Sequence, residues 1–331
     1  MKKGDFTMSK IKELLVPEVF NRYVNEKMTE LSALVQSGII KHDPQLDSLA
    51  SAGGRIINMP YLLNFTDEDE VLDTNKALKA EDLKSDKTRA IVVQRGKAFR
   101  VNDLEQSLAM GNSKDLMSEV ASRVATYWVQ REQAMLLSTL KGIFAEGTGM
   151  EGNIYTATAI GKTGTPGKIS AVEMVKAKNR LGDHSSQLKA IAMHSNVMTE
   201  LEVQQLIEYV QPAGAVSQEP IAYYQGKRVI VDDSLVADEN GVYTTYLFAE
   251  GAFGKGNAVI PNSFEYDRDA LTGNNFLISR RGFVLHPQGL DYKDAVCEGE
   301  TPSNTELAKG ENWARKFANK AIPVVAFRHT I

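Results

Sequence analysis

Apolar residues recur at every fourth position along one stretch near the middle of the chain. The series comprises Leu116, Val120, Val124, Trp128, Leu136, Leu140 and Phe144. This spacing puts the apolar side chains on one face of an α-helix, so it predicts a helix over residues 114 to 144. At about 1.5 Å per residue the helix would be about 45 Å long, well above the length of an ordinary globular helix. The pattern therefore indicates a strut that crosses the molecule.

Two segments on the N-terminal side of this helix look like extensions. Residues 9 to 50 predict a helix interrupted at Pro17 and then a polar stretch, with no second element nearby to pack on. Such arms usually lie on something else. Residues 56 to 59 predict a short strand that Pro60 ends, and its expected partner is a strand at residues 90 to 101.

The stretch between these two strands is long and charged. It exceeds twenty residues and holds few apolar side chains, which is unusual between paired strands of a compact domain. One interpretation is a flexible loop. The sharper interpretation is a projecting two-stranded loop whose partner is another molecule.

The second half of the sequence alternates short helices and strands. Capping boxes predict two helix starts, at Asn102 with Glu105 and at Ser170 with Glu173. The apolar run 188–193 predicts a buried strand, followed by a helix over 197–209 with Ser195 or Asn196 as its N-cap. Further strands are expected within 226–235, 242–253 and 274–287, with a short helix around Trp313 and a last strand ending at Phe327. The predicted fold class is α+β.

Composition narrows the functional classes. The 331 residues are 43% hydrophobic and 24% charged, which are ordinary values for a globular protein with a core. The net charge of −4 argues against a dedicated nucleic-acid binder, which needs a basic surface. The single cysteine, Cys297, excludes an intrachain disulfide and is interpreted as a small, inert hydrophobe. No window approaches the roughly 18 apolar residues of a membrane span, so no membrane association is expected.

Two glycine patterns imitate nucleotide-binding motifs without their context. Gly147, Gly149 and Gly152 have the spacing G-x-G-x-x-G, but they follow the predicted long helix and run into non-helical residues. A dinucleotide site needs the opposite order, a strand before the glycines and a helix after them. The "GKTG" at Gly161 lacks the earlier glycine of a phosphate-binding loop, because Thr156 stands there. We interpret the first pattern as a flexible linker and expect no cofactor.

The titratable residues form no recognisable site in the sequence. No two of the histidines have metal-ligand spacing; they are His42, His184, His194, His286 and His329. Asp232 and Asp233 follow a predicted strand, where Asp most often forms a turn. His194 beside Ser195 suggests a hydrolase, but a triad is assembled in space, and the helix-capping interpretation is favoured. We therefore expect no catalytic, cofactor-binding or metal-binding residues.

A series of segments, in this order, resembles one known family. "GGRIINMPYL" and "VVQRGKAFRVNDLEQS" are similar to the start and the return of an extended loop, and "ASRVATYWVQREQAMLLSTLKGIF" to a spine helix. "LKAIAMHSNVMTELE", "YYQGKRVIVDDSL" and "YTTYLFAEGAFGKG" are similar to later core elements. The family is the major capsid proteins of tailed bacteriophages with the Hong Kong 97-type fold. The resemblance covers residues 50 to 290, and the ends match less clearly.

The resemblance implies an α+β Hong Kong 97-type fold with a defined division of the chain. The implied parts are an N-terminal arm at 1-54, an E-loop at 55-101, a peripheral P-domain at 102-190 with the spine helix 114-144, a mainly axial A-domain at 191-285, and a C-terminal return to the core at 286-331.

The resemblance also implies a structural role and no enzyme activity. The chain would assemble through hexamers and pentamers into an icosahedral shell that encloses double-stranded DNA, in the virion and, during assembly, in the host cytoplasm. Its partners would be itself, together with scaffolding, portal, and head-completion or decoration proteins; packaged DNA would be contacted only non-specifically. The alternatives are an encapsulin-type compartment shell, which shares the fold, and a soluble hydrolase that uses Ser195.

Some relatives in that family crosslink neighbours through a lysine–asparagine isopeptide bond. On position alone the candidates in the charged loop are Lys76, Lys79, Lys84 and Lys87. The favoured interpretation is a solvated charged loop whose surface ion pairs each contribute little.

Overall fold

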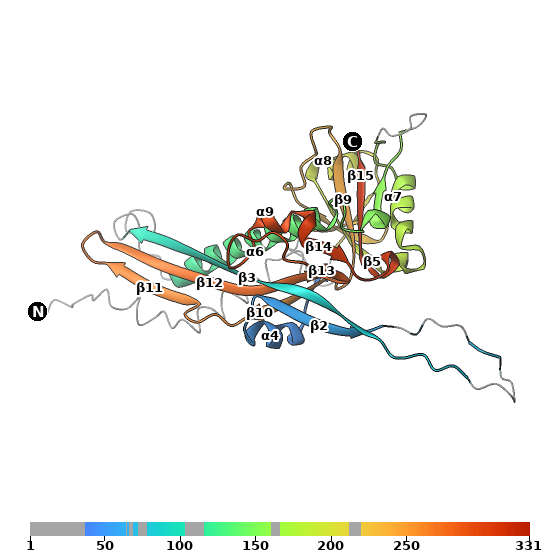
Figure 1. Ribbon diagram of the computed structural model, residues 1–331. Helices are drawn as coiled ribbons and strands as arrows, with labels where there is room; N and C mark the ends of the chain where they lie inside the picture. Colours follow the sequence, from blue (N-terminus) through green and yellow to red (C-terminus); the bar gives the residue numbers. More distant parts are fainter. Residues whose placement is uncertain are drawn as a thin grey trace, which may run out of the picture.

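A computed structural model describes residues 37–63, 65, 69–71, 78–102, 116–159, 166–211 and 220–331. The predicted arm helix, the short helix after Asn102, the "GKTG" motif at Gly161 and the side chain of Lys76 lie outside these described residues. The molecule has an elongated part, built on one long sheet, and a second part that stands to one side of it (Figure 1).

The long sheet combines strands from both halves of the chain. Its order is β1-β10-β12-β3-β2, with β11 also paired to β12. The strands are β1 (Ile40–His42), β2 (Ile56–Leu62), β3 (Ser85–Asn102), β10 (Phe253–Ala258), β11 (Phe264–Asp269) and β12 (Asn274–Pro287). β3 and β12 run antiparallel from Val92 opposite Val284 to Asn102 opposite Asn274. This long pair gives the elongated part its length.

Alternation along β3 explains how both faces of this sheet are covered. Ile91 and Val93 belong to the largest apolar core, which includes the C-terminal half of helix α6. Ala90 and Val92 point the other way and join a separate cluster with Ala50 of helix α4 (Pro44–Ser51). Since successive strand residues face opposite sides, α6 and α4 cover opposite faces. Figure 1 shows the two helices on either side of the sheet.

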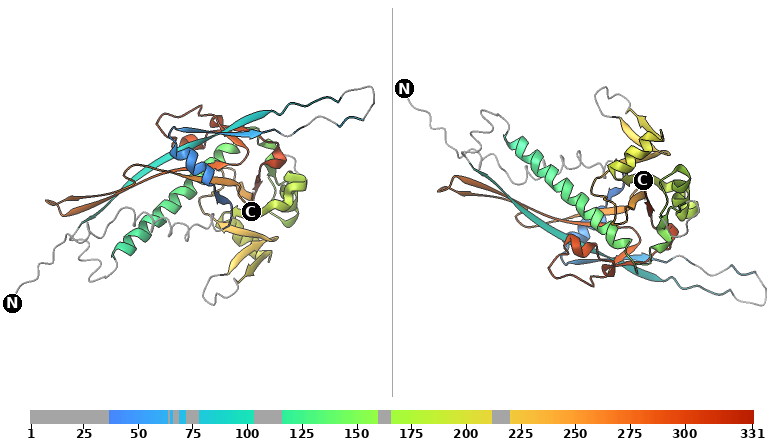
Figure 2. Two further views of the ribbon diagram at one scale, coloured as in Figure 1. Left: turned by 90° about the horizontal axis from the view of Figure 1, so that it is seen from below. Right: turned by 90° about the horizontal axis from the view of Figure 1, so that it is seen from above.

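Helix α6 (Leu116–Ile143) confirms the predicted strut. Its 28 residues correspond to about 42 Å, and Figure 2 shows it running obliquely to the long strands. Trp128 is 2% exposed, and its Nε1 donates to Ser279 Oγ in β12 at 3.0 Å. Lys255 Nζ of β10 donates to Glu132 Oε2 at 2.6 Å. Apolar packing and two polar contacts thus fix the helix to the sheet.

The second part of the molecule is built on a seven-stranded sheet of order β4-β15-β9-β5-β8-β7-β6. These strands are β4 (Ile154–Thr156), β5 (Leu188–Met193), β6 (Ile207–Val210), β7 (Ile221–Tyr224), β8 (Lys227–Val231), β9 (Tyr243–Ala249) and β15 (Val324–His329). Helices α7 (Ala171–Lys178) and α8 (Ser195–Val203) share a second apolar cluster with one face of this sheet. The predicted strand 188–193 is confirmed at the centre of the sheet.

The remaining elements join the two parts. They are β13 (Leu290–Tyr292), β14 (Trp313–Arg315), helix α9 (Asn304–Leu307) and the 3₁₀ segments η1 (Glu151–Asn153), η2 (Asn179–Gln187), η3 (Gly310–Asn312) and η4 (Asn319–Ala321). The short helix predicted around Trp313 is wrong, because Trp313 opens a strand and the helix lies earlier. Ser303 and Glu306 form a capping box that starts α9.

Several predictions near the N-terminal side were also wrong. The polar stretch before residue 52 holds strand β1 and helix α4, which starts at N-cap Asp43 with Pro44 in its first turn. This Asp-Pro pair is a helix-start signal. Strand β2 runs through Pro60 to Leu62 and does not end at Met59. β2 is the last strand of its sheet, where the missing N–H of a proline removes no bond to a further strand.

The glycine-rich stretch after α6 is ordered, so the linker interpretation is wrong. Its residues Met150 and Asn153 are fully buried. Asn153 Nδ2 lies within hydrogen-bonding distance of three carbonyl oxygens, on Asn319, Ile322 and Val324, at 2.9 to 3.3 Å. Residues 154–156 then form β4, which confirms that the glycines run into a non-helical segment.

The helix predicted over 197–209 is shorter than expected. It ends at Val203, and residues 207–210 form strand β6. Gln205 takes a φ of 58°, a left-handed conformation that stops the helix. The range 191–285 is likewise divided between the two sheets, since β5 to β9 lie in the seven-stranded sheet and β10 to β12 pair with β1 and β3.

Candidate assembly surface

The β2–β3 hairpin projects from the packed core (Figure 1). Its register runs from Ile56 opposite Ile91 to Leu62 opposite Ser85. Beyond the strands, Leu63 N donates to Lys84 O at 2.9 Å. Figure 1 shows the hairpin leaving the body at the end opposite the β11–β12 tip. The prediction of a projecting two-stranded loop is therefore confirmed.

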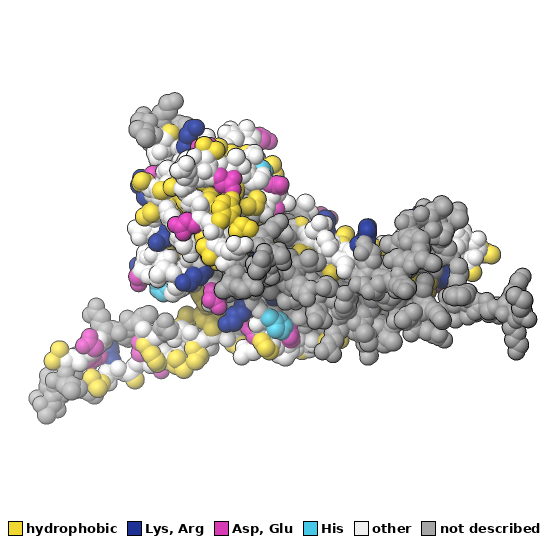
Figure 3. All heavy atoms as spheres, turned by 180° about the vertical axis from the view of Figure 1, so that it is seen from behind, with side chains coloured by type: hydrophobic (Ala, Val, Ile, Leu, Met, Phe, Trp, Pro, Cys, Tyr) yellow, Lys and Arg dark blue, Asp and Glu magenta, His cyan; other side chains and the backbone are white. Residues whose placement is uncertain are grey.

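Apolar side chains on this hairpin face solvent. Those exposed are Leu62 (63%), Leu63 (41%), Phe65 (64%), Val71 (93%), Leu78 (63%) and Leu83 (57%). Figure 3 shows apolar atoms along the projection. Single exposed apolar residues are ordinary, but a run of them on one extended element is typical of a surface that a partner covers.

The base of the hairpin is held to the C-terminal part of the chain by Asp291. Its carboxylate accepts from Arg89 N at 2.8 Å, from Arg89 Nε at 3.1 Å and from Arg89 Nη2 at 2.7 Å. Asp291 is only 4% exposed. Burial alone would raise the pKa of Asp291, but the hydrogen bonds from Arg89 outweigh burial and the pKa is lowered. Asp291 is thus ionised, and both of its carboxylate oxygens accept hydrogen bonds from Arg89.

A second group of contacts lies farther out along the hairpin. Lys316 Nζ donates to Asp86 Oδ2 at 2.9 Å, and Tyr61 Oη donates to the same oxygen at 3.2 Å. The ring of Tyr61 meets Phe317 edge to face with centroids 4.9 Å apart. Exposed ion pairs contribute little singly. Combined with the Arg89–Asp291 pair, they fix the direction in which the hairpin leaves the body.

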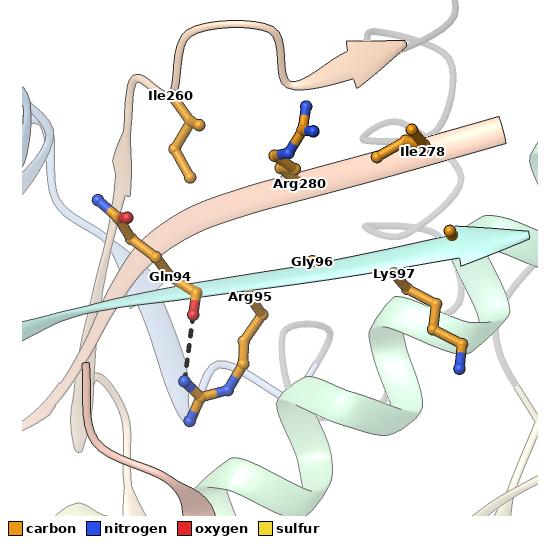
Figure 4. Close-up of a pocket in the computed structure, with 8 residues that line it drawn as sticks. Gln94, Arg95, Gly96, Lys97, Ile260, Ile278 and Arg280 are labelled. Carbon is orange, nitrogen blue, oxygen red and sulfur yellow. Dashed lines mark hydrogen bonds between the residues drawn. The ribbon is translucent and has the colours of Figure 1, made fainter. Parts of the chain in front are cut away.

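A shallow groove of about 420 Å³ lies on β3 and β12, beyond the part that α4 covers. Gly96 and Ala98 form its floor, opposite Arg280 and Ile278, and Ile260 stands at its edge (Figure 4). In the same view the side chains of Arg95 and Lys97 point to the other face of the sheet. Its lining contains no acid, histidine or cysteine that could transfer a proton or attack a substrate.

His194 and Ser195 occupy a helix start and do not form a triad. His194 Nδ1 accepts a hydrogen bond from Asn196 N at 3.0 Å, so the N-cap is His194 and neither predicted residue. Asp233 Oδ1 accepts a hydrogen bond from the backbone N of Ser195 at 3.4 Å, so this carboxylate contacts the serine backbone. In a triad the acid orients the histidine, and the histidine is free to take the serine proton. Here Ser195 Oγ lies 3.4 Å from His194 Nδ1, but that nitrogen already accepts from Asn196 N, and the hydrogen bond to Asp233 comes from Ser195.

The other histidines are structural. His286 is buried, its Nε2 donates to Leu290 O at 2.9 Å, and burial lowers its pKa to about 4. His329 is buried beside Thr245 Oγ1 at 2.8 Å, and burial again lowers its pKa to about 4. His42 contacts Asp47 at 3.0 Å, and His184 contacts Gln187 at 3.1 Å. Within the described ranges, no three His, Cys, Asp or Glu residues are grouped so that they could hold a metal ion.

The remaining candidates also have local roles. Cys297 is half-buried, its Sγ donates to Gly299 O at 3.2 Å, and burial raises the pKa of the thiol, which keeps it in the unreactive form. Asp232 accepts from Gln133 Nε2 at 2.5 Å and so ties the end of β8 to α6. Lys79, Lys84 and Lys87 are exposed on the hairpin. None of the helices in the described part of the chain is long and apolar enough to cross a membrane.

Comparisons with known proteins agree with this architecture. Residues 64–323 match the model of a family described as Gp13-like, major capsid protein 13-like. The chain is 37% identical to the major capsid protein of Bacillus phage SPP1 over 332 aligned positions, covering 98% of each chain.

Two solved structures show the same fold at low sequence identity. The capsid of Ralstonia phage GP4 superposes with a TM-score of 0.59 at 12% identity, covering 90% of this chain and 88% of that one. The capsid of cyanophage Pam1 superposes with a TM-score of 0.51, also at 12% identity, covering 92% of each chain.

Proposed function

The chain belongs to the Gp13-like family of major capsid proteins, and on that premise we propose how its extensions build the shell. It is a structural protein of a phage head and not an enzyme. Membership in a family of phage capsid proteins also favours a virus shell over the alternative of an encapsulin-type compartment shell. The capsid fold is the Hong Kong 97-type fold expected from the sequence.

We propose that the copies associate head to tail into hexamers and pentamers, which together close an icosahedral shell around double-stranded DNA. A head-to-tail contact closes into a ring when its rotation allows, and one chain can serve rings of two sizes if its contacts tolerate small changes of angle. A long hairpin suits this need, because it keeps its contacts while the packed cores tilt.

In this proposal the β2–β3 hairpin lies on the adjacent copy of the same ring. The observation that carries it is the run of exposed apolar side chains on an element whose base is fixed by buried and surface ion pairs. Burying a side chain such as Leu62 or Phe65 contributes about 1.5–3 kcal/mol. Because every subunit makes the same contact, modest energies add up around a ring.

The proposed division of the chain follows the two sheets. The arm is 1-54 and the E-loop is 55-101, and their strands β1, β2 and β3 also contribute to the long sheet. The peripheral domain combines α6 with the long sheet, including β10 to β12. The axial domain combines β4 to β9 with β15. This division differs from the expected ranges 102-190, 191-285 and 286-331. β12 pairs with β3 in the long sheet, whereas the end of the chain pairs with β9 in the seven-stranded sheet as β15.

Scaffolding, portal, and head-completion or decoration proteins are the further partners we propose, with the host cytoplasm as the place of assembly. The net charge of −4 fits a shell that holds DNA without binding it tightly. A lysine–asparagine crosslink through the exposed Lys79, Lys84 or Lys87 is the weaker proposal, because a solvated charged loop remains the favoured interpretation of these residues.

The test replaces the exposed apolar residues at the start of the projection. The double variant Leu63→Ser with Phe65→Ser should fold like the wild type but fail to form rings or shells in electron micrographs. The matched control is Val259→Ser, which removes an apolar side chain that is 80% exposed outside the hairpin. Normal shell yield from the hairpin variant would refute the proposed contact.

A further inference from the structure

The β6 edge of the seven-stranded sheet combines acidic and exposed apolar side chains. Val203 at the end of α8 is 74% exposed, and Tyr209 and Val210 of β6 are 54% and 51% exposed. Glu202 of α8 and Glu208 of β6 are also exposed, on either side of this edge, because Glu208 alternates with Ile207 and Tyr209 on the α8 side. Glu202 accepts from the Tyr209 hydroxyl, and neither glutamate has a cationic partner in the described part of the chain. We call this set the acidic face.

Another side of the same domain combines basic and exposed apolar side chains. Val172 and Val175 of α7 are 63% and 51% exposed. Lys178 at the end of α7 and Lys189 of β5 lie close to Lys227 of β8. We call this set the basic face.

Lys227 shows that the positive charge of the basic face is unbalanced within the subunit. It is only 5% exposed, and its Nζ donates to Gln225 O at 3.2 Å. Burial lowers the pKa of Lys227, and the charges of Lys178 and Lys189 lower it further. Within residues 166–211 and 220–331, none of these three lysines forms an ion pair with a carboxylate.

The two faces are separated as a ring contact requires. β6 is an edge strand, and its outer side has no strand partner among the residues that the structure describes. Figure 2 shows β6 and β7 projecting from one side of the domain while α7 lies on another side. A head-to-tail interface needs two different, complementary patches on each copy. Opposite charges around apolar centres are such a pair, and an exposed edge strand is usually covered.

We propose that the basic face of one copy docks against the acidic face of the next copy around the axis of each ring. Lys178 and Lys189 then lie near Glu202 and Glu208 of the neighbouring copy, and Val172 and Val175 lie against its β6 edge. This inference rests on the proposed function, since it assigns the contact between axial domains within the same ring.

The experiment reverses charge on each face of the full-length chain. Lys178→Glu with Lys189→Glu makes both faces acidic, and Glu202→Lys with Glu208→Lys makes both basic. Each double variant should assemble about tenfold less than the wild type at low ionic strength, with a smaller deficit at high salt. All four changes in one chain should restore assembly. Circular dichroism and thermal melting verify that each variant folds.

Mixing the two double variants gives a sharper readout. Neither associates with itself, but in a 1:1 mixture the two alternate around a ring. An alternating ring closes only with an even number of copies, so six-membered rings should form and five-membered rings should not. The control, Lys293→Glu with Glu300→Lys, reverses two exposed charges elsewhere and should assemble normally.

The outcomes separate this inference from the proposed function. If folded double variants assemble as well as the wild type, or if the fourfold variant is folded but not rescued, the docking of these faces is wrong. The hairpin contact can still hold in that case, because the Leu63 and Phe65 variant tests it independently. If the wild-type chain forms neither rings nor shells under any assembly condition, both the proposed function and the docking of the basic face on the acidic face are wrong.

Discussion

Replacing Gly142, near the end of α6, by alanine should destabilise the protein, although helix propensity alone predicts that it would stabilise the helix. Replacing a glycine inside a helix by alanine normally stabilises the helix by about 1 kcal/mol. Here a methyl group would overlap the carbonyl oxygen of Leu307 and come within 2.6 Å of Trp313 Nε1 and 2.8 Å of Trp313 Cδ1. These neighbours are backbone and a fully buried ring, so neither can move aside cheaply.

The expected magnitude follows from these contacts. Trp313 Nε1 donates to Leu307 O at 2.8 Å, and losing that bond costs about 1 kcal/mol. Forcing an extra methyl into a packed core costs about 1–3 kcal/mol. Subtracting the gain in helix propensity leaves Gly142→Ala about 1–3 kcal/mol less stable than the wild type. For a chain of 331 residues this lowers Tm by about 1–4 °C.

The assay is thermal melting of the unassembled subunit, together with urea unfolding followed by tryptophan fluorescence. Gly96→Ala is the control, because its new methyl would lie 3.6 Å from Arg280 Cγ, an ordinary contact. That variant should stay within about 0.5 kcal/mol of the wild type. A Gly142→Ala protein that melts at or above the wild-type temperature would refute the close packing of α6 against α9 and Trp313.

Four further predictions concern stability and assembly. Burial lowers the pKa values of His286 and His329 to about 4, so between pH 4 and pH 6.5 the unfolded chain binds protons that the folded chain does not. The free energy of unfolding should therefore be highest above pH 6.5 and fall toward pH 4. His286→Gln should flatten this pH dependence in urea unfolding. Arg89→Met should lower the free energy of unfolding by about 1–3 kcal/mol in urea, because the buried Asp291 carboxylate loses the hydrogen bonds from the Arg89 side chain. An unchanged unfolding midpoint would contradict the role of the Arg89–Asp291 pair. His194→Ala should cost about 1 kcal/mol through the lost N-cap whereas His194→Asn retains most stability, and Ser195→Ala should change neither stability nor assembly. Deleting residues 67–81 with a short Gly-Ser join should leave the overall strand content in circular dichroism unchanged, because β2 and β3 lie outside the deleted segment, but should abolish shells in micrographs.

Long, regular patterns in the sequence predicted the fold best. The fourfold spacing through Trp128 and Leu140 identified α6, because only a helix puts such residues on one face. The run 188–193 identified β5, because all its residues except the exposed Lys189 are apolar, as is typical of a strand buried on both faces. The charged stretch after β2 indicated a projecting hairpin, because a compact domain rarely leaves so long a polar connection unused.

Short signals and long-range contacts were not predictable in the same way. Strand β6 was taken for helix because "LIEYV" continues the apolar spacing of α8, and only the left-handed conformation at Gln205 ends that helix. Histidine is not among the residue types preferred as N-caps, although His194 Nδ1 accepts a hydrogen bond as a serine or aspartate oxygen does. The clamp between Arg89 and Asp291 joins residues 202 positions apart, and no local pattern indicates such a pair.

The central claim is that each copy's β2–β3 hairpin lies on the adjacent copy of one ring. Cryo-electron microscopy of shells assembled from the full-length chain tests it most directly. We expect rings of six and five copies in which Leu62 and Phe65 of one copy are covered by its neighbour. Shells in which the hairpins extend free into solvent, or a chain that stays a uniform monomer with scaffold supplied, would contradict it.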